Sequence, residues 1–413
     1  MQTKPVLFCV VLLVSNTIFN AIFANIPDPI KDIVKMLIVP QPLDPVLIKI
    51  QAEILPTRLS FPTFASQNGY IAFAQVVTDH LDQKRFSLPM PKEARTAALL
   101  PESEDFMADA SQNVQSRTCP TKPCYPEGFL TGWLGAFGEY AHEKPQPDVA
   151  AFTFNVGGAV LGLDYNCVDE NVVGFGGSYV YSRVNDDADA GNANVHQGLF
   201  GFYTLLHTSE IYYNLGLFGG YYHIDQVRNM PILGTLFVAS SNTHGWQLAP
   251  HAEIGYDGYL SHVCNFEWFG IGPFVLADWV ANWEDGCLEH GAGLLNTKVD
   301  GRFCSLLRAE AGLRFHETIK YCWGHLVFQE KGSYAYQKMF GTGSITALFP
   351  SVPSTGPFTG RTLQTAQNLG VFEFSVLFKP TKRSYPYGNL RYQGQFGSKF
   401  QSHQGIVEIG KDF

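Results

Sequence analysis

Residues 306–316 read Leu-Leu-Arg-Ala-Glu-Ala-Gly-Leu-Arg-Phe-His, and from Leu307 on, apolar side chains occupy every second position. Because successive side chains of a β-strand point to opposite faces, Leu313 and Phe315 share one face while Arg308 and Arg314 share the other. A soluble β-sandwich also contains strands of this kind, so one such strand does not distinguish a sandwich from a barrel. The alternation recurs, however, from residue 129 to the aromatic end of the sequence. That combination is typical of a transmembrane β-barrel, which is apolar outside and polar inside.

The alternation predicts an all-β fold, a twelve-stranded antiparallel transmembrane β-barrel over residues 129–413. The predicted strands cover residues 129–142, 151–164, 172–183, 195–206, 210–225, 243–259, 265–281, 302–316, 320–330, 367–378, 385–396 and 404–413.

The lengths of the connections favour a barrel over a sandwich. Connections after the even-numbered strands are short, as at Glu317–Ile319. Outer-membrane barrels have short periplasmic turns and long external loops. Because the number of strands is even, the first strand begins and the last strand ends on the same, periplasmic side. We expect the loop Lys331–Ala366, rich in Gly, Ser, Thr and Pro, to meet partners outside. The connections after the odd-numbered strands are mostly longer: 183–194, 226–242, 282–301 and 331–366.

The polar face of the predicted strands carries charges of both signs. A charge buried in a lumen persists only if it is paired or wetted, so we expect these groups to pair with one another. The candidate lumen-facing residues are Glu253, Arg308, Glu310, Arg314, Glu373, Arg391 and Glu408.

The first 128 residues differ from the rest. Residues 1–24 are typical of a secretory signal peptide, with Lys4 before an apolar core. Residues 25–65 form a proline-dotted N-terminal extension, and residues 66–128 a helix with a linker. The helix is predicted over 66–85 from its apolar period, with Ser66 or Asn68 as the N-cap. By itself the pattern fits an amphipathic periplasmic helix.

Composition narrows the class of protein. After residue 24 no apolar run reaches the roughly 18 residues of a spanning helix. The 40 glycines and 14% aromatic residues fit a barrel with aromatic girdles. A net charge of −9 argues against nucleic acid as a partner, since nucleic-acid-binding surfaces are basic.

The cysteines and histidines form no recognisable reactive site. Export makes disulfides feasible, and the candidate pairs are Cys119 with Cys124 and Cys287 with Cys304. The Cys and His spacings do not match a zinc site, and no nucleophile elbow is present. His223 and His244 are among several histidines able to pair with nearby carboxylates. We therefore expect no catalytic residues, no metal and no cofactor.

Three segments carry a family resemblance: Gly132-Trp-Leu-Gly-Ala-Phe-Gly138, Pro273-Phe-Val-Leu-Ala-Asp-Trp-Val280 and Leu306-Leu-Arg-Ala-Glu-Ala-Gly-Leu313. With them, residues 129–413 resemble the translocator β-domain of autotransporter (type V secretion) proteins. The scattered cysteines are similar to those of chlamydial polymorphic outer membrane proteins. The resemblance implies a twelve-stranded barrel in the outer membrane of a Gram-negative-type bacterium, plugged by the helix 66–85. With the barrel assembly machinery it delivers an N-terminal passenger to the surface, and Phe413 acts as the assembly signal.

The N-terminal part of the chain differs from that of typical autotransporters. Autotransporter passengers are usually long and repetitive, whereas only about 40 residues without repeats lie between Ala24 and the predicted helix. We therefore expect a translocator or surface anchor for a short N-terminal segment, whose external loops contact host or envelope proteins. The alternative is a porin-like diffusion channel. The outer wall would contact outer-membrane lipid in either case.

Overall fold

The computed structural model describes residues 60–87 and 128–413, with gaps in the second range. The expected signal peptide, most of the N-terminal extension, the linker 88–127, Cys119 and Cys124 lie outside the described residues. The gaps are 146–149, 168–170, 188–189, 209, 233–234, 262–267, 322, 342–343, 352–356, 362, 364–365 and 383–384.

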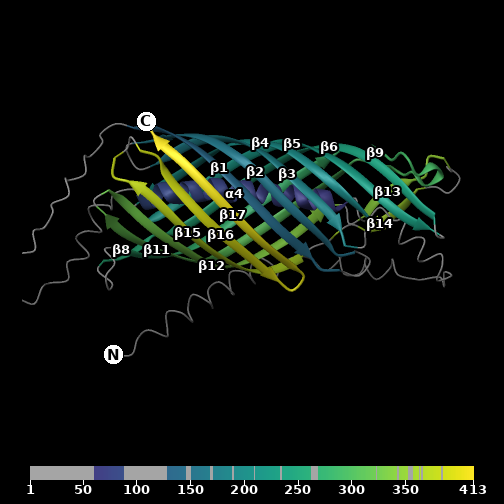
Figure 1. The fold of residues 1–413 in the computed structure, drawn as a ribbon. Helices are drawn as coiled ribbons and strands as arrows, with labels where there is room; N and C mark the ends of the chain where they lie inside the picture. The colour runs from purple at the N-terminus through teal and green to yellow at the C-terminus, as the bar shows by residue number, and fades with distance from the viewer. Residues whose placement is uncertain are drawn as a thin grey trace, which may run out of the picture. The chain divides into compact units, whose positions relative to one another are not determined.

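Twelve antiparallel strands close into a barrel, as the alternation predicts (Figure 1). Each strand pairs with its neighbours in the chain, and the last strand closes on the first with Ile409 opposite Leu134. A closed barrel has no free sheet edge, so every strand is paired on both sides. The strands are β1 (Phe129–Glu143), β2 (Phe152–Asn166), β3 (Val172–Asp186), β4 (Gly191–Thr208), β5 (Ile211–Ile232), β6 (Thr235–Tyr256), β8 (Trp268–Glu284), β11 (Arg302–Tyr321), β12 (Gly324–Gly341), β15 (Ala366–Pro380), β16 (Tyr387–Gly397) and β17 (Phe400–Asp412). The short strand β7 (Gly258–Ser261) continues the line of β6 along β8.

The two ends of the barrel differ, and we call them the turn end and the loop end. The turn end holds Phe413 and the connections after β2, β4, β7, β11 and β15. The loop end holds the other connections, including the two longest, residues 285–301 and 342–365. These two pair into a small sheet of β9 (Cys287–Leu288), β10 (Lys298–Val299), β13 (Ser344–Leu348) and β14 (Phe358–Arg361), with a 3₁₀ turn, η2, at Gly293–Leu295.

Several predicted strand ends were wrong. Strands β5 and β6 continue as a paired hairpin through most of the predicted loop 226–242, and β3 and β4 shorten the loop 183–194 to residues 187–190. The turn between β11 and β12 lies at 322–323 rather than 317–319, so residues 331–341 belong to β12 and not to a loop. Near and beyond the membrane surface neither face of a strand needs to be apolar, so the alternation fades while the backbone pairing continues.

A helix, α4 (Phe61–Ser87), runs inside the barrel (Figure 1). It begins five residues before the predicted start, so neither predicted N-cap is correct, and Asn68 donates a hydrogen bond to the Phe64 carbonyl within the helix at 2.8 Å. From Phe61 to Arg85 only Gln75 is more than slightly exposed. Burial on all sides removes the one-sided apolar pattern that would mark the helix ends. Among the described residues no helix has both the length and the apolarity to cross a membrane.

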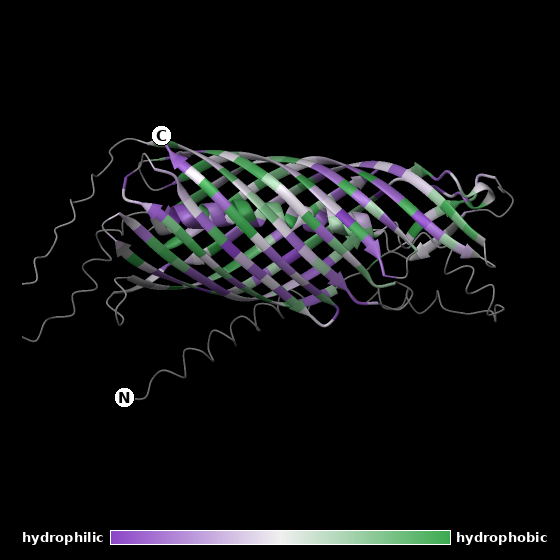
Figure 2. Cartoon of the chain, in the orientation of Figure 1, coloured by the Kyte–Doolittle hydropathy of each residue, from purple (hydrophilic) through white to green (hydrophobic). Residues whose placement is uncertain are grey.

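Figure 2 shows hydrophobic and hydrophilic residues alternating along the strands. The residues exposed on the outside are apolar in the middle of the barrel, with aromatic residues near both ends. Leu161, Phe202 and Leu390 are exposed there. Such an apolar band between aromatic girdles is the surface that a transmembrane barrel presents to lipid. The exposed tyrosines and tryptophans of these girdles include Tyr165, Tyr213, Tyr256, Tyr321 and Trp323 near the turn end, and Tyr181, Tyr221, Trp246 and Trp283 near the loop end.

Candidate functional site: the lumen and its helix

The helix α4 passes through the lumen from the loop end to the turn end. Near its start, the Phe61 ring stacks on Phe152, at the loop end of β2, with the ring centres 4.2 Å apart. Near its end, Lys84 Nζ donates to Thr131 Oγ1 at 2.5 Å and lies 3.4 Å from Asp412 Oδ1, both at the turn end. The chain therefore enters the barrel at the loop end and leaves it at the turn end.

One side of the lumen, the inner face of β1–β5, is mostly apolar, and we call it the apolar wall. Phe64 packs edge-on against Phe154 with ring centres 5.9 Å apart, and Phe73 packs edge-on against Phe218 at 5.2 Å. The prediction of a polar interior throughout was therefore wrong here, because the helix presents aromatic and aliphatic side chains to these strands. The buried apolar residues of the wall include Trp133, Phe137, Phe152, Phe154, Val156, Val160, Val172, Val180, Val184, Val195, Leu199, Leu205, Phe218 and Ile224.

The helix backbone comes close to the apolar wall at Gly69. A Cβ atom at this position would lie 2.5 Å from Gln197 Oε1 and 3.2 Å from Val180 Cγ1. Gln197 Nε2 in turn donates to the backbone oxygen and the hydroxyl of Ser66, at 3.1 and 2.9 Å. A residue with a side chain would displace the Gln197 amide and press on Val180, so glycine suits this close approach to β3 and β4.

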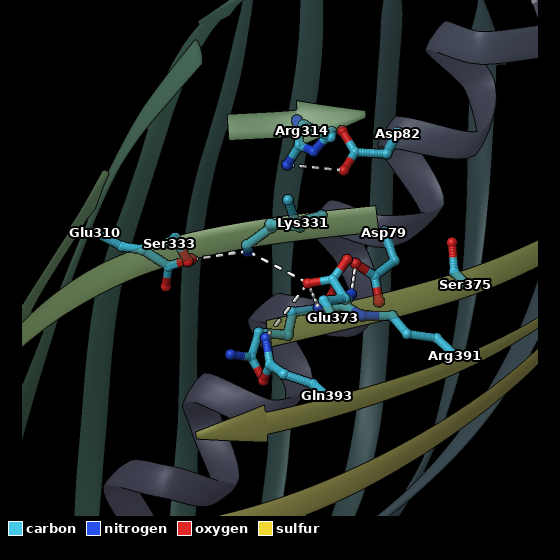
Figure 3. Close-up of polar contacts among 12 residues, drawn as sticks. Asp79, Asp82, Glu310, Arg314, Lys331, Ser333, Glu373, Ser375, Arg391 and Gln393 are labelled. Atoms are coloured by element: carbon cyan, nitrogen blue, oxygen red, sulfur yellow. Dashed lines mark hydrogen bonds and ion pairs between the residues drawn. The ribbon is translucent and has the colours of Figure 1, made fainter. Parts of the chain in front are cut away.

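The opposite side, the inner face of β11, β12, β15, β16 and β17, carries charged and amide side chains, and we call it the polar wall. Its central group is Arg391, which pairs with Asp79 of the helix and lies 2.5 Å from Glu373 Oε2 (Figure 3). Lys331 Nζ links Glu373 at 3.4 Å to Glu310 at 2.9 Å. All five side chains are buried, so each charge depends on its partners instead of on water.

A second charged group joins the helix to the wall nearer the turn end. Arg314 lies 3.1 Å from both Asp82 of the helix and Glu253 of β6. Arg85 lies 3.2 Å from Asp82 and 3.0 Å from Asp257, which follows β6. Charges of both signs thus alternate from strand to helix and back to strand.

His80 forms a third contact between the helix and the barrel. Its Nδ1 lies 2.6 Å from Glu408 Oε1, its Nε2 contacts Asp164, and its ring stacks on Trp133 with centres 4.4 Å apart. Gln83 adds a hydrogen bond to Glu408 at 2.9 Å. Because Glu408 lies on β17 and Asp164 on β2, one helix side chain connects strands on both sides of the barrel closure.

The helix is also held where it enters the barrel. Thr63 Oγ1 donates to Glu284 Oε2 at 2.6 Å and accepts a hydrogen bond from Arg302 Nη2 at 2.7 Å. The backbone N–H of Leu363, in the connection before β15, donates to Ser60 Oγ at 3.1 Å. Both Ser60 and Leu363 are buried, so this connection covers the entry of the helix.

The structure places all seven candidate lumen residues inside the barrel, where each has a partner. Glu253 accepts a hydrogen bond from Tyr212 and pairs with Arg314, and Arg308 donates to Glu310 at 2.8 Å. The partners of Glu373, Arg391 and Glu408 are given above. Sequence reasoning missed Lys331, because it was assigned to a loop, and the helix residues that reach these charges. The signal for the latter was present in the charges of the predicted helix end: Asp79, His80, Asp82 and Arg85.

The cysteine prediction was wrong where the structure describes both partners: Cys287 and Cys304 are free thiols. Cys304 is buried in the lumen, where Gln67 Nε2 lies 3.7 Å from its Sγ, whereas Cys287 packs in the small loop-end sheet against an apolar cluster of Val299, Ile345 and Ala347. Burial, helped by the negative charges of Glu284 and Glu289, raises the pKa of the Cys287 thiol to about 11. Little thiolate is then available for exchange at neutral pH.

Phe413 lies at the turn end with its ring exposed, and its backbone N–H donates to the Leu130 carbonyl at 2.8 Å. Its role in assembly stays a prediction.

Comparison with known proteins agrees with this architecture. A family model described as the autotransporter β-domain matches residues 132–399. The structure is similar to the translocator domain of the autotransporter NalP from Neisseria meningitidis, with a TM-score of 0.53 at 13% identity over 69% of this chain and 88% of that one. It is also similar to the β-domain of the Bordetella autotransporter BrkA, with a TM-score of 0.47 at 18% identity over 69% of this chain and all of that one. No curated protein matches the sequence.

Proposed function

This chain belongs to the autotransporter β-domain family, and on that premise we propose that its barrel holds a short N-terminal segment at the cell surface. The barrel is an outer-membrane translocator barrel of a Gram-negative bacterium. The turn end then faces the periplasm and the loop end faces outward.

The direction of α4 carries the proposal. Its first residue is held at the loop end by the contacts of Ser60 and Thr63, and its last turn lies at the periplasmic end beside Asp412. The chain before Ser60 is therefore joined to the barrel on the outer side, whereas the chain after Ser87 leads back to β1 on the periplasmic side. This is the arrangement that remains after a segment has passed outward through the lumen.

An epitope tag tests the proposal. Placed within residues 25–59, the tag should be accessible to antibody and protease on intact cells. The matched control is the same tag within residues 88–127, which should become accessible only after the outer membrane is permeabilised. A tag in 25–59 that is reached only after permeabilisation would contradict the proposal.

The filled lumen disfavours the diffusion channel. The helix occupies the bore with buried side chains from Phe61 to Arg85 and bonds both walls. In planar bilayers we expect the full-length protein to show only brief openings. A steady conductance from the full-length protein would instead support the channel.

We further propose that the protein is a structural translocator and not an enzyme. Ser178, the serine of a Gly-Gly-Ser sequence, has no hydrogen-bond partner for its hydroxyl among the described residues, so no base activates it there. The proposed partners are outer-membrane lipid on the apolar outer band, the barrel assembly machinery at Phe413, and host or envelope proteins at the loop end. Of the predicted partner loop 331–366, the part beyond β12 is the part that lies at the loop end.

A further inference from the structure

Two histidines face each other on the outside of the barrel near the loop end. His223 of β5 lies directly opposite His244 of β6, and their Nδ1 atoms are 2.9 Å apart. Both side chains are at least partly exposed, so neither takes part in holding the helix.

The pair lies at the boundary between lipid and water. One step toward the turn end on the same face, Tyr221 is opposite Trp246, and both rings are exposed as members of the aromatic girdle. One step toward the loop end, Asp225 is opposite Asn242. Aromatic girdles mark the membrane interface, so the two imidazoles lie at the level of the headgroups and can be reached by ions from the water.

Asp225 determines which nitrogen of His223 carries a proton. Its Oδ1 lies 3.0 Å from His223 Nε2, so Nε2 donates to the carboxylate and Nδ1 keeps its lone pair. That lone pair accepts a hydrogen bond from His244 Nδ1–H, and the His244 ring stacks on Tyr221 with centres 5.8 Å apart. An ion that takes the place of this proton meets a lone pair on each Nδ1 once the His244 proton has moved to Nε2. A carboxylate on the far nitrogen of a histidine is the usual second partner of a metal-binding imidazole.

We propose that His223 and His244 bind a divalent copper or nickel ion through their two Nδ1 atoms. Two nitrogens in adjacent positions of a square-planar ion, each about 2.0 Å from the metal, lie about 2.8 Å apart, whereas a tetrahedral ion spreads them to about 3.3 Å. The 2.9 Å separation is that of the hydrogen bond which the ion would replace, and the nitrogens need to move less to reach the square-planar spacing than the tetrahedral one. Together with the higher affinity of nitrogen ligands for Cu²⁺ than for Zn²⁺, this favours Cu²⁺ or Ni²⁺, with water in the remaining positions.

The neighbouring ionisable groups do not enlarge the site. His196 lies opposite His223 on β4, but its Nδ1 is engaged with Tyr179 Oη at 2.7 Å. The described residues contain no group of three or more metal-binding side chains around one position. The site is therefore a two-nitrogen chelate oriented by Asp225.

The test uses the full-length protein in detergent micelles, titrated with CuCl₂ and followed by calorimetry and by the nitrogen couplings of the Cu²⁺ electron paramagnetic resonance spectrum. We expect one two-imidazole site that disappears in both His223→Gln and His244→Gln. In Asp225→Asn the same site should bind about tenfold more weakly, because the far nitrogen loses its carboxylate.

Two matched controls separate this site from other copper binding. His196→Gln and His403→Gln each remove an outward histidine hydrogen-bonded to a tyrosine, and both should bind Cu²⁺ as the unaltered protein does. The inference is overturned if the His223→Gln/His244→Gln double variant keeps the two-imidazole spectrum, if Asp225→Asn binds as tightly as the unaltered protein, or if Zn²⁺ binds more tightly than Cu²⁺. Unchanged unfolding midpoints show that the variants are folded, as expected for side chains outside the barrel.

Discussion

The two walls of the lumen hold the same helix by different means. On the apolar wall the helix backbone comes close at Gly69, and rings such as Phe64 and Phe73 fill the space between strands and helix. On the polar wall the connection is made by long side chains, Arg391 and Arg314 above all, that reach carboxylates on the helix. The apolar wall excludes water, and the polar wall replaces it with paired charges.

The two walls contribute differently to how strongly the helix is held and to its position along the barrel axis. Apolar contact is non-directional, so a helix that slid along β1–β5 would lose the close approach at Gly69 and the hydrogen bonds of Ser66 and His80 but would exchange most of its apolar contacts for others. A slide of one turn, 5.4 Å, would instead break the pairs of Asp79 and Asp82 with Arg391 and Arg314 and leave buried charges alone. We infer that the apolar wall supplies most of the attraction and that the polar wall fixes the position at which the helix stops.

The largest expected effect comes from breaking the polar wall at Arg391. Arg391→Met leaves Asp79 buried without its cation and Glu373 with Lys331 alone, and we expect the free energy of unfolding in urea to fall by about 3–5 kcal/mol. Adding Asp79→Asn should restore much of the loss, because the buried charge of Asp79 is then removed together with that of its partner. Arg183→Met, an exposed arginine, is the control and should change stability by less than about 0.5 kcal/mol. A loss below about 1 kcal/mol in Arg391→Met would show that water hydrates the charges of the polar wall and that their pairing is not required for stability.

The matching change on the apolar wall is Phe73→Ala. It removes the ring that packs on Phe218 and leaves a cavity between helix and strands, which should cost about 3 kcal/mol in the same urea titration. The control Phe200→Ala removes an equal ring from the lipid-facing side of β4, where no cavity forms. If both variants lose the same stability, the helix is not packed on this wall.

The comparison of the walls also shows what could be predicted from the sequence. The alternation in β6, β11, β15, β16 and β17 assigned seven charged residues to the inner face, because there the polar lumen and the apolar lipid put different demands on the two faces. It could not reveal the apolar wall, since β2–β5 meet apolar surroundings on both faces. Nor could it pair Arg391 with Asp79, because partners in distant segments are set by the position of the helix, which no local pattern encodes.

A bulkier residue at Gly69 should move the helix away from the apolar wall. Gly69→Leu forces a side chain against Gln197 and Val180, and we expect a loss of about 1–3 kcal/mol together with longer openings in planar bilayers. Gln75→Leu is the control, since Gln75 is half-buried and its backbone oxygen accepts a hydrogen bond from Arg391 of the polar wall. Longer openings in both variants, or in neither, would contradict the view that the helix packs closely against the apolar wall at Gly69.

The smallest expected effect is at Thr63, where the helix meets the junction of β8 and β11. Thr63→Val removes a hydroxyl bonded to Glu284 and Arg302, but these two remain paired at 2.8 Å. Because no buried charge loses its ionic partner, the loss in unfolding free energy should be only about 1 kcal/mol, far below that of Arg391→Met. Thr204→Val, which removes a hydroxyl bonded to the Val172 carbonyl without touching the helix, is the control for a lost hydroxyl. A loss at Thr63 as large as at Arg391 would mean that the entry of the helix, and not the polar wall, fixes its register.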